Sequence, residues 1–174
     1  PPDLVRNLEG WLKVELTYTS NAIEGNTLSR AETALIVEKG LTVEGKTLTE
    51  HLEAVNHAQA LDFISTLGRL KRSDVTERQL LELHRLILQK IDDTNAGRYR
   101  TVAVRIAGSR AIMPNPVKVP QLMDEFIAWL HTARGNELVI AADAHFLLVS
   151  IHPFTDGNGR TGRIINVLYL VKEK

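Results

Sequence analysis

The sequence predicts an all-α domain that carries one protruding β-hairpin. Two observations predict the helices: apolar residues recur at spacings of three and four along most of the chain, and three segments have the Ser/Thr-x-x-Glu/Gln pattern of a helix N-terminus. A third observation predicts the hairpin, because one short stretch rich in Val and Ile alternates weakly around a glycine. The length of 174 residues suits one domain with a core of its own.

Four helices are expected before the hairpin. The first is predicted by an apolar stripe at every fourth position with a tryptophan beside it: Leu4, Leu8, Leu12, Leu16 and Trp11. Capping boxes begin the other three, at residues 29–32, 47–50 and 76–79. The helix after residue 47 should run to about Leu67. The helix after residue 76 should bury one face: Leu80, Leu83, Ile87 and Ile91.

Three more helices are expected after the hairpin. Pro120 suits a first helical turn, and an apolar face follows it: Leu122, Phe126, Trp129 and Ala133. Residues 137–151 are apolar on nearly all sides, which predicts a central buried helix. The last helix should begin near Gly159 or Arg160.

The hairpin is predicted over residues 100–116. The turn falls at Ala107-Gly108-Ser109, and Pro114-Asn115-Pro116 cannot continue a regular strand ladder, so the second strand should end there.

The composition excludes several classes of protein. Lys and Arg number 21 and Asp and Glu also 21, which indicates no basic surface for nucleic acid. The chain has no cysteine, which rules out disulfides and thiolate metal sites. No apolar run approaches the roughly 20 residues of a membrane span, and no signal peptide begins the chain, so a cytoplasmic protein is expected. Because the sequence lacks an initial Met and stops inside an apolar helical pattern, we expect a fragment of a longer protein.

Residues 152–163 read His-Pro-Phe-Thr-Asp-Gly-Asn-Gly-Arg-Thr-Gly-Arg and carry the residue types that nucleotide chemistry needs. Pro153 disfavours helix at His152, so the preceding helix should end there and present the imidazole. A Gly-Asn-Gly loop directly before a helix can point several N–H groups into one concavity, where the helix dipole favours an anion. This segment therefore predicts a phosphate cradle beside a histidine.

Charged side chains complete the predicted site. Arg160 and Arg163 are three residues apart, so they share one helix face and can both bind phosphate oxygens. Asp156 offers one carboxylate to Mg²⁺, and His152 can accept a proton near neutral pH. Together these groups predict phosphoryl-type transfer from a nucleotide.

Each feature also has an ordinary structural explanation. A single Gly-Asn-Gly is usually a turn, and two arginines at this spacing are usually a solvated helix face. His84 and His145 are interpreted in this way, as packed or surface histidines. His152 differs because the other groups needed for chemistry lie within the next eleven residues.

The same twelve residues match the Fic family signature, H-x-F-x-[D/E]-G-N-G-R-x-x-R, at every fixed position, and the chain therefore resembles that family. The resemblance implies a Fic-type helical bundle that transfers AMP from ATP to a hydroxyl side chain of a target protein. It implies His152 as the catalytic base and Asp156 as the ligand of Mg²⁺. It also implies a nucleotide-binding set: Asp156, Gly157, Asn158, Gly159, Arg160, Thr161, Gly162 and Arg163.

A second segment, Ser20-Asn21-Ala22-Ile23-Glu24-Gly25, resembles the family's inhibitory motif, [S/T]-x-x-x-E-[G/N]. The resemblance implies that Glu24 pairs with Arg163 and takes the place of the γ-phosphate of ATP. The ordinary alternative is a helix C-terminus ended by Gly25. On this basis, residues 1–40 form an N-terminal region with an inhibitory helix, and residues 41–174 form a Fic catalytic core truncated at its C-terminus.

In the family, a β-hairpin flap binds an extended segment of the target as an added strand. By resemblance, Thr101 to Asn115 would be this flap, with Ile106, Ala107, Gly108 and Ser109 on the nucleotide side. A hairpin without substrate contact is the alternative.

Other functions stay open at this point. The same scaffold could remove AMP, with Glu24 positioning a water, or transfer another phosphate-bearing group. It could also be a non-catalytic, toxin–antitoxin-type regulatory module. The sequence identifies neither the target protein nor the oligomeric state, and a homo-oligomer stays open.

Overall fold

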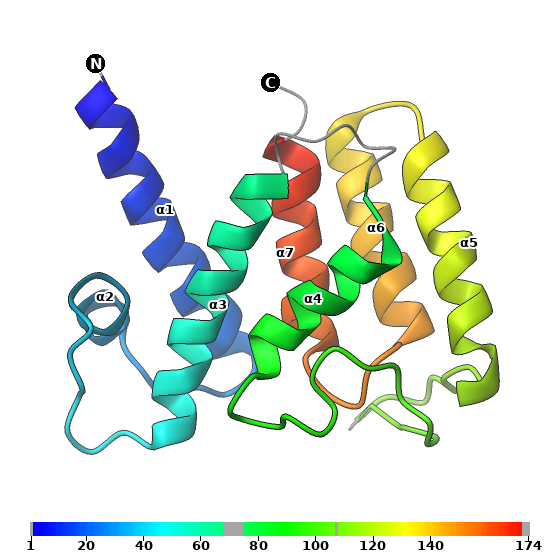
Figure 1. Cartoon of the computed structure of the whole chain (residues 1–174), viewed down its shortest axis with the longest axis horizontal. Helices are drawn as coiled ribbons and strands as arrows, with labels where there is room; N and C mark the ends of the chain where they lie inside the picture. Colours follow the sequence, from blue (N-terminus) through cyan, green and yellow to red (C-terminus); the bar gives the residue numbers. More distant parts are fainter. Residues whose placement is uncertain (1, 68–74, 107, 172–174) are drawn as a thin grey trace.

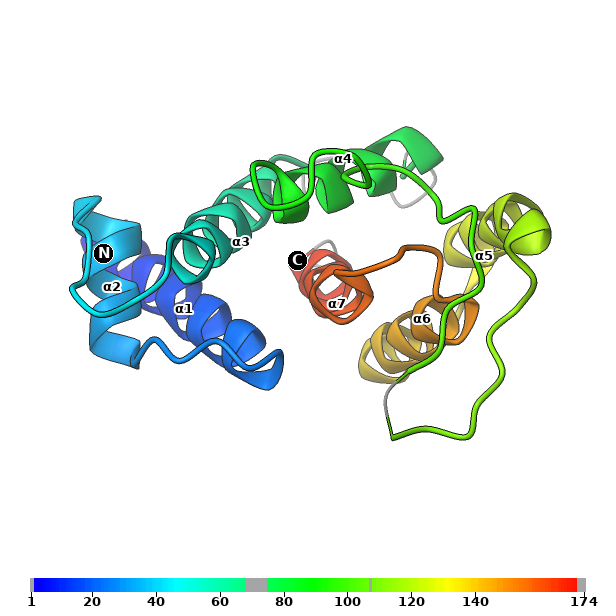
Figure 2. The same ribbon diagram turned by 90° about the horizontal axis from the view of Figure 1, so that it is seen from below.

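The computed structural model describes residues 2–67, 75–106 and 108–171, and it is helical. Its elements in chain order are α1 (Pro2–Ile23), α2 (Arg30–Lys39), α3 (Leu48–Leu67), α4 (Glu77–Leu88), the short 3-10 helix η2 (Pro116–Lys118), α5 (Val119–Thr132), α6 (Glu137–Ile151) and α7 (Asn158–Val171). In both views α7 lies between α1, α3 and α4 on one side and α5 and α6 on the other (Figures 1 and 2). Its first turn therefore begins in the middle of the bundle.

The predicted capping boxes are confirmed. Ser29 and Thr76 each accept a hydrogen bond from the backbone three residues ahead, and the side chain at that position bonds back to the cap. The Oγ1 of Thr47 accepts from the Glu50 N–H while a Glu50 carboxylate oxygen accepts from the Thr47 N–H, so α3 begins in the same way. α5 carries Pro120 in its first turn as predicted.

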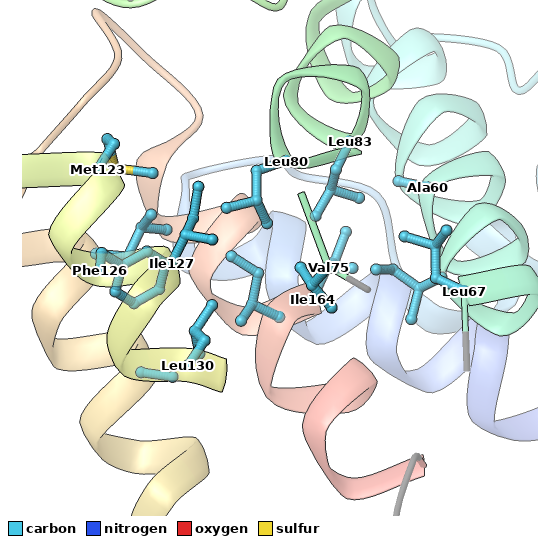
Figure 3. Close-up of a cluster of buried hydrophobic side chains, with 14 of the residues drawn as sticks. Ala60, Leu67, Val75, Leu80, Leu83, Met123, Phe126, Ile127, Leu130 and Ile164 are labelled. Atoms are coloured by element: carbon cyan, nitrogen blue, oxygen red, sulfur yellow. The ribbon is translucent and has the colours of Figure 1, made fainter. Parts of the chain in front are cut away.

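The main core surrounds α7 and joins α3 to α6 (Figure 3). Ile164 and Ile165 of α7 are each only 1% exposed, and α4 contributes the predicted Leu80, Leu83 and Ile87. Ile91 lies beyond the end of α4, so that part of the prediction is wrong. α5 buries five residues: Val119, Met123, Phe126, Ile127 and Leu130.

The expectation that residues 137–151 form a central buried helix is wrong. α6 occupies residues 137–151 as predicted, but Leu138, Val139 and Phe146 are more than half exposed, so α6 borders the core instead of crossing its centre. On α1, Leu4 and Leu8 are also more than half exposed, and Leu16 is the residue of the predicted stripe that packs against the core. Figure 1 shows the reason, since the N-terminal half of α1 extends past the other helices.

The predicted β-hairpin is wrong, because residues 101–106 and 108–115 contain no strand. The segment is a loop whose turn is closed by one bond, from the Ser109 N–H to the Ile106 carbonyl (3.1 Å). A two-stranded hairpin is marginal unless one face packs on something, and here Val102 and Ile112 are 56% and 95% exposed. Figure 2 shows the loop as an open arc that passes α6 on its way to α5.

No helix in the described part of the chain is both long and apolar enough to cross a membrane. A small second core joins α2 to α3 through Leu28, Ile36 and Ala54, and thus includes residues on both sides of the predicted boundary after residue 40. That division of the chain stays a prediction.

Candidate active site

The candidate site is the loop from His152 to Gly157 and the first turn of α7. α6 ends at Ile151, and His152 has a φ of 51°, in the left-handed region that few residues other than glycine adopt. The helix therefore ends where the following Pro153 led us to expect.

The imidazole of His152 is oriented as a base. Its Nδ1 lies 3.3 Å from the Val149 carbonyl oxygen, which only accepts, so the proton resides on Nδ1. The Nε2 lone pair is then left to take a proton from another group. Burial lowers the pKa of His152, and this keeps the ring neutral at physiological pH.

The loop is closed by Asn158, whose side chain is buried. Its amide oxygen accepts from the Phe154 N–H (3.0 Å), and its amide nitrogen donates to the Phe154 carbonyl (2.9 Å). These bonds use the side chain that the resemblance assigned to nucleotide phosphates. The structure therefore gives the Asn158 side chain a loop-closing role. The N–H groups of the first turn of α7, which have no acceptor within the helix, remain the candidate anion cradle.

His84, on α4, supports the loop from beneath. Its ring stacks on Phe154 with centroids 3.6 Å apart, its Nε2 donates to the Asp156 carbonyl (3.0 Å), and its Nδ1 accepts from the Gly97 N–H (3.0 Å). Burial lowers the pKa of His84 to about 4, so the ring is neutral at pH 7 and stabilises the loop through its two hydrogen bonds and its stacking on Phe154. The interpretation of His84 as a packed histidine agrees with this geometry.

Asp156 is the candidate metal ligand. Its side chain is 65% exposed, with one oxygen accepting from the Gly157 N–H (2.6 Å) and the other 3.3 Å from a guanidinium nitrogen of Arg160. A single accessible carboxylate at the edge of a phosphate cradle fits Mg²⁺, which takes one or two carboxylates in nucleotide sites and its remaining ligands from phosphates and water.

Arg160 is buried, with its side chain 4% exposed, and bonds to Glu53 on α3 (2.9 Å) in addition to Asp156. The other oxygen of Glu53 accepts from the Asn26 side chain (2.8 Å). Glu53 was not predicted, because it precedes Arg160 by 107 residues and carries no local signal.

Arg163 meets the predicted inhibitory motif. Its Nε donates to the Ser20 hydroxyl (2.8 Å), and its Nη2 donates to the Ser20 carbonyl (3.0 Å) and to Glu24 (2.5 Å). A Cβ at Gly159 would lie 2.5 Å from the Glu24 carboxylate, so only glycine there allows this approach. Glu24 follows the last residue of α1, and Gly25 has a φ of 94°, so the segment is also the helix end that was its alternative.

Other predicted residues lie away from the cradle. Thr161 is fully buried, and a Cβ at Gly162 would lie 2.9 Å from the ring of His145 on α6, so both positions serve helix packing. In the loop, Gly108 and Ser109 are exposed and Ile106 is partly buried, with hydrogen bonds that stay within the loop. Ala107 lies outside the described residues.

Arg100 was also not predicted. It is buried and donates to the His152 carbonyl (2.7 Å) from the residue that precedes the loop. Its partners are backbone carbonyl groups, which no sequence pattern identifies.

The fold and the site define a helical domain that presents a histidine, a carboxylate and two arginines around the N-terminus of one helix. The model of the Fic/DOC family matches residues 74–170, which include the whole of this arrangement except α1 and α3. The chain belongs to the Fic/DOC family.

Named relatives agree with this assignment. The chain is 37% identical over 155 residues to the protein adenylyltransferase Fic of Culex quinquefasciatus and 38% identical over 151 residues to that of Drosophila melanogaster. These alignments cover 87% and 85% of the chain but only 31% and 30% of the relatives, so the chain spans about a third of their length.

Solved structures show the same fold. Fic-1 from C. elegans (residues 134–508) superimposes with a TM-score of 0.84 at 34% identity, covering 96% of this chain and 50% of that one. A Fic-domain-containing signalling protein from Bacteroides thetaiotaomicron gives a TM-score of 0.88 at 27% identity, covering 99% of this chain and 67% of that one.

Proposed function

We propose that the chain is the catalytic core of a protein adenylyltransferase, which transfers AMP from ATP to a hydroxyl side chain of a target protein. The observation that carries the proposal is the orientation of His152: its Nδ1 is bonded to the Val149 carbonyl, and its Nε2 is left as a proton acceptor beside the first turn of α7. The named relatives support the reaction type, since both are protein adenylyltransferases.

The reaction follows from these groups. The Nε2 of His152 takes the proton of the target hydroxyl as its oxygen attacks the α-phosphorus. The new bond joins that oxygen to phosphorus, the bond from the α-phosphorus to the bridging oxygen breaks, and pyrophosphate leaves. N–H groups at the start of α7 stabilise the negative charge of the phosphates.

Mg²⁺ would be held by Asp156 and would neutralise charge on the phosphates as pyrophosphate leaves. The exposed carboxylate of Asp156, already oriented by the Gly157 N–H, supports this assignment.

Glu24 would inhibit the reaction. Its carboxylate occupies the guanidinium of Arg163, so the terminal phosphate of ATP has to compete for the same partner and meets a negative charge there. The loop from Thr101 to Asn115 would bind the target protein. We also expect a cytoplasmic location, as the composition indicated.

Labelled ATP tests the proposal. The parent chain, Glu24→Gly and Glu24→Gly/His152→Ala are incubated with ATP labelled at the α- or the γ-phosphate. We expect self-labelling from α-labelled ATP alone, strongest in Glu24→Gly and reduced roughly 10²–10⁴-fold by the loss of His152. Labelling from the γ-phosphate would instead indicate a kinase-like activity. No labelling from either would favour a non-catalytic module, and loss of label from a pre-labelled chain would favour AMP removal.

A further inference from the structure

Arg100 is a buried guanidinium, 3% exposed, beside the candidate base. Its three nitrogens donate to three backbone carbonyl groups: Nε to His152 (2.7 Å), Nη1 to Val102 (3.0 Å) and Nη2 to Pro114 (2.7 Å). Burying a charge is unfavourable unless hydrogen bonds compensate it, so this set of bonds is specific to one geometry.

The three carbonyl groups belong to two parts of the molecule. Val102 and Pro114 lie at the two ends of the loop from Thr101 to Asn115, and His152 is the first residue after α6. The Arg100 N–H adds a fourth link, to the Pro153 carbonyl (2.9 Å). Arg100 therefore links both ends of the loop to the backbone of His152 and Pro153 through hydrogen bonds.

The bonds of Arg100 are the main interactions that the described residues show between the ends of the loop and the rest of the site. Residues 101–106 and 108–115 form no strand ladder, and Figure 2 shows this segment as an open arc that passes α6. At the other end of the linkage, His152 holds a left-handed backbone conformation, which persists only where the surroundings impose it. The bond from Arg100 to the His152 carbonyl supplies such a constraint.

We propose that Arg100 is a positioning residue. It holds the target-binding loop at a fixed position relative to His152, so that a hydroxyl presented on the loop reaches Nε2. The proposal rests on the adenylyltransferase function proposed above. It assigns Arg100 a role in the alignment of the acceptor and none in the binding of ATP.

The test compares Arg100→Lys with Arg98→Lys in the Glu24→Gly background. Lysine at residue 100 keeps the charge but cannot reach three carbonyl groups at once, whereas Arg98 is an exposed neighbour without these bonds. We expect Arg100→Lys to slow self-labelling at saturating ATP roughly 10²-fold, the effect of a small misplacement of reacting groups. The ATP Kd from calorimetry should stay within about twofold, and Arg98→Lys should match the parent.

Amide hydrogen exchange adds a readout that requires no turnover. Arg100→Lys should speed exchange both in the described parts of the loop and at the His152 N–H, while the amides of α3 keep their protection. Faster exchange in the loop alone, unchanged labelling, or an ATP Kd weakened as much as the rate would each overturn the proposal. If no variant transfers AMP, the adenylyltransferase function fails, and the exchange pattern still decides whether Arg100 couples the loop to His152.

Discussion

Arg160 and Arg163 lie three residues apart on α7, yet their surroundings differ completely. Arg160 is 4% exposed and is held by Glu53 of α3 and by Asp156 of the adjoining loop. Arg163 is 23% exposed and is held by Ser20 and Glu24, at the end of α1. The partners of Arg160 lie on α3 and on the loop before α7, whereas those of Arg163 lie at the C-terminal end of α1.

The difference separates two roles that the sequence alone assigns to both residues. Arg160 is a structural part of the site, because its buried guanidinium joins α3 to the loop through Glu53 and Asp156, and releasing it would leave Glu53 with the Asn26 side chain alone. Arg163 and Glu24 are partly exposed, so the guanidinium of Arg163 can exchange the Glu24 carboxylate for an anionic ligand. We therefore expect Arg163 to bind the terminal phosphate and Arg160 to fix Asp156.

The first and largest expected effect is on stability. Glu53→Ala should lower the free energy of unfolding by about 3–4 kcal/mol, because it leaves the buried Arg160 with one carboxylate instead of two. The matched control is Glu15→Ala, which breaks the pairing with the largely exposed Arg30 and should cost under about 1 kcal/mol. Urea unfolding measures both, and equal losses would show that the Arg160 pairing is no more important than a surface one.

The second effect is on how the free energy of unfolding depends on pH, through His84, whose pKa is affected by Arg160. Burial is the main cause that lowers the pKa of His84 to about 4, and the positive charge of Arg160 also contributes. Between pH 6.5 and about 4 the unfolded chain binds a proton at this residue that the folded chain does not, so stability falls as the pH falls. The loss attributable to His84 approaches roughly 3 kcal/mol.

His57 adds to this slope, because burial and both arginines lower its pKa to about 3. Glu50 acts in a lower range, below its unfolded value of 4.5, since hydrogen bonds lower its pKa to about 2. Urea midpoints at pH 7 and pH 5 for the parent and His84→Gln therefore isolate the histidines. A slope that is the same in both proteins would contradict the assignment to His84.

The third effect is on activity. Glu24→Gly should raise AMP transfer about 30-fold, equivalent to about 2 kcal/mol of coupling, by releasing Arg163 for the nucleotide. Glu24→Gln keeps the shape without the charge and should give part of the gain. In a double mutant with Arg163→Ala the gain should vanish, because both changes act on one contact. A gain that persists without Arg163 would mean that glycine acts by loosening α1 instead.

The sequence predicted the parts of this site that local order determines. His152 to Arg163 form one continuous loop and helix turn, so their spacing along the chain is close to their arrangement in space. The capping boxes were predicted for the same reason, since each joins residues three positions apart. Glu24 was predicted only through the resemblance to a family motif, and the structure places it on Arg163.

The features that the sequence did not predict depend on contacts between residues far apart in the chain, or on whether another element covers an apolar face. The exposure of α6 and of the start of α1 cannot be seen in an apolar pattern, which shows that a face is apolar but not whether anything covers it. Glu53 and Arg100 act across long sequence separations, and the partners of Arg100 are carbonyl groups that every residue has. Nucleotide binding at Asn158 stays a prediction, and the side chain closes the loop through bonds to the Phe154 backbone that no sequence pattern indicates.

The smallest expected effect concerns Ser20, whose hydroxyl accepts one of the three bonds that hold Arg163. Ser20→Ala removes that bond but leaves the Ser20 carbonyl and Glu24 in place, and alanine suits the helix slightly better than serine. We expect a gain in AMP transfer of roughly fivefold, corresponding to about 1 kcal/mol for one hydrogen bond. The control is Thr19→Ala, because the neighbouring hydroxyl bonds to the Glu15 carbonyl and does not contact Arg163. If Ser20→Ala matches the parent, the hydroxyl has no part in holding Arg163. If it matches Glu24→Gly, the hydroxyl and not the carboxylate is the decisive contact, and the contrast between the two arginines no longer rests on charge.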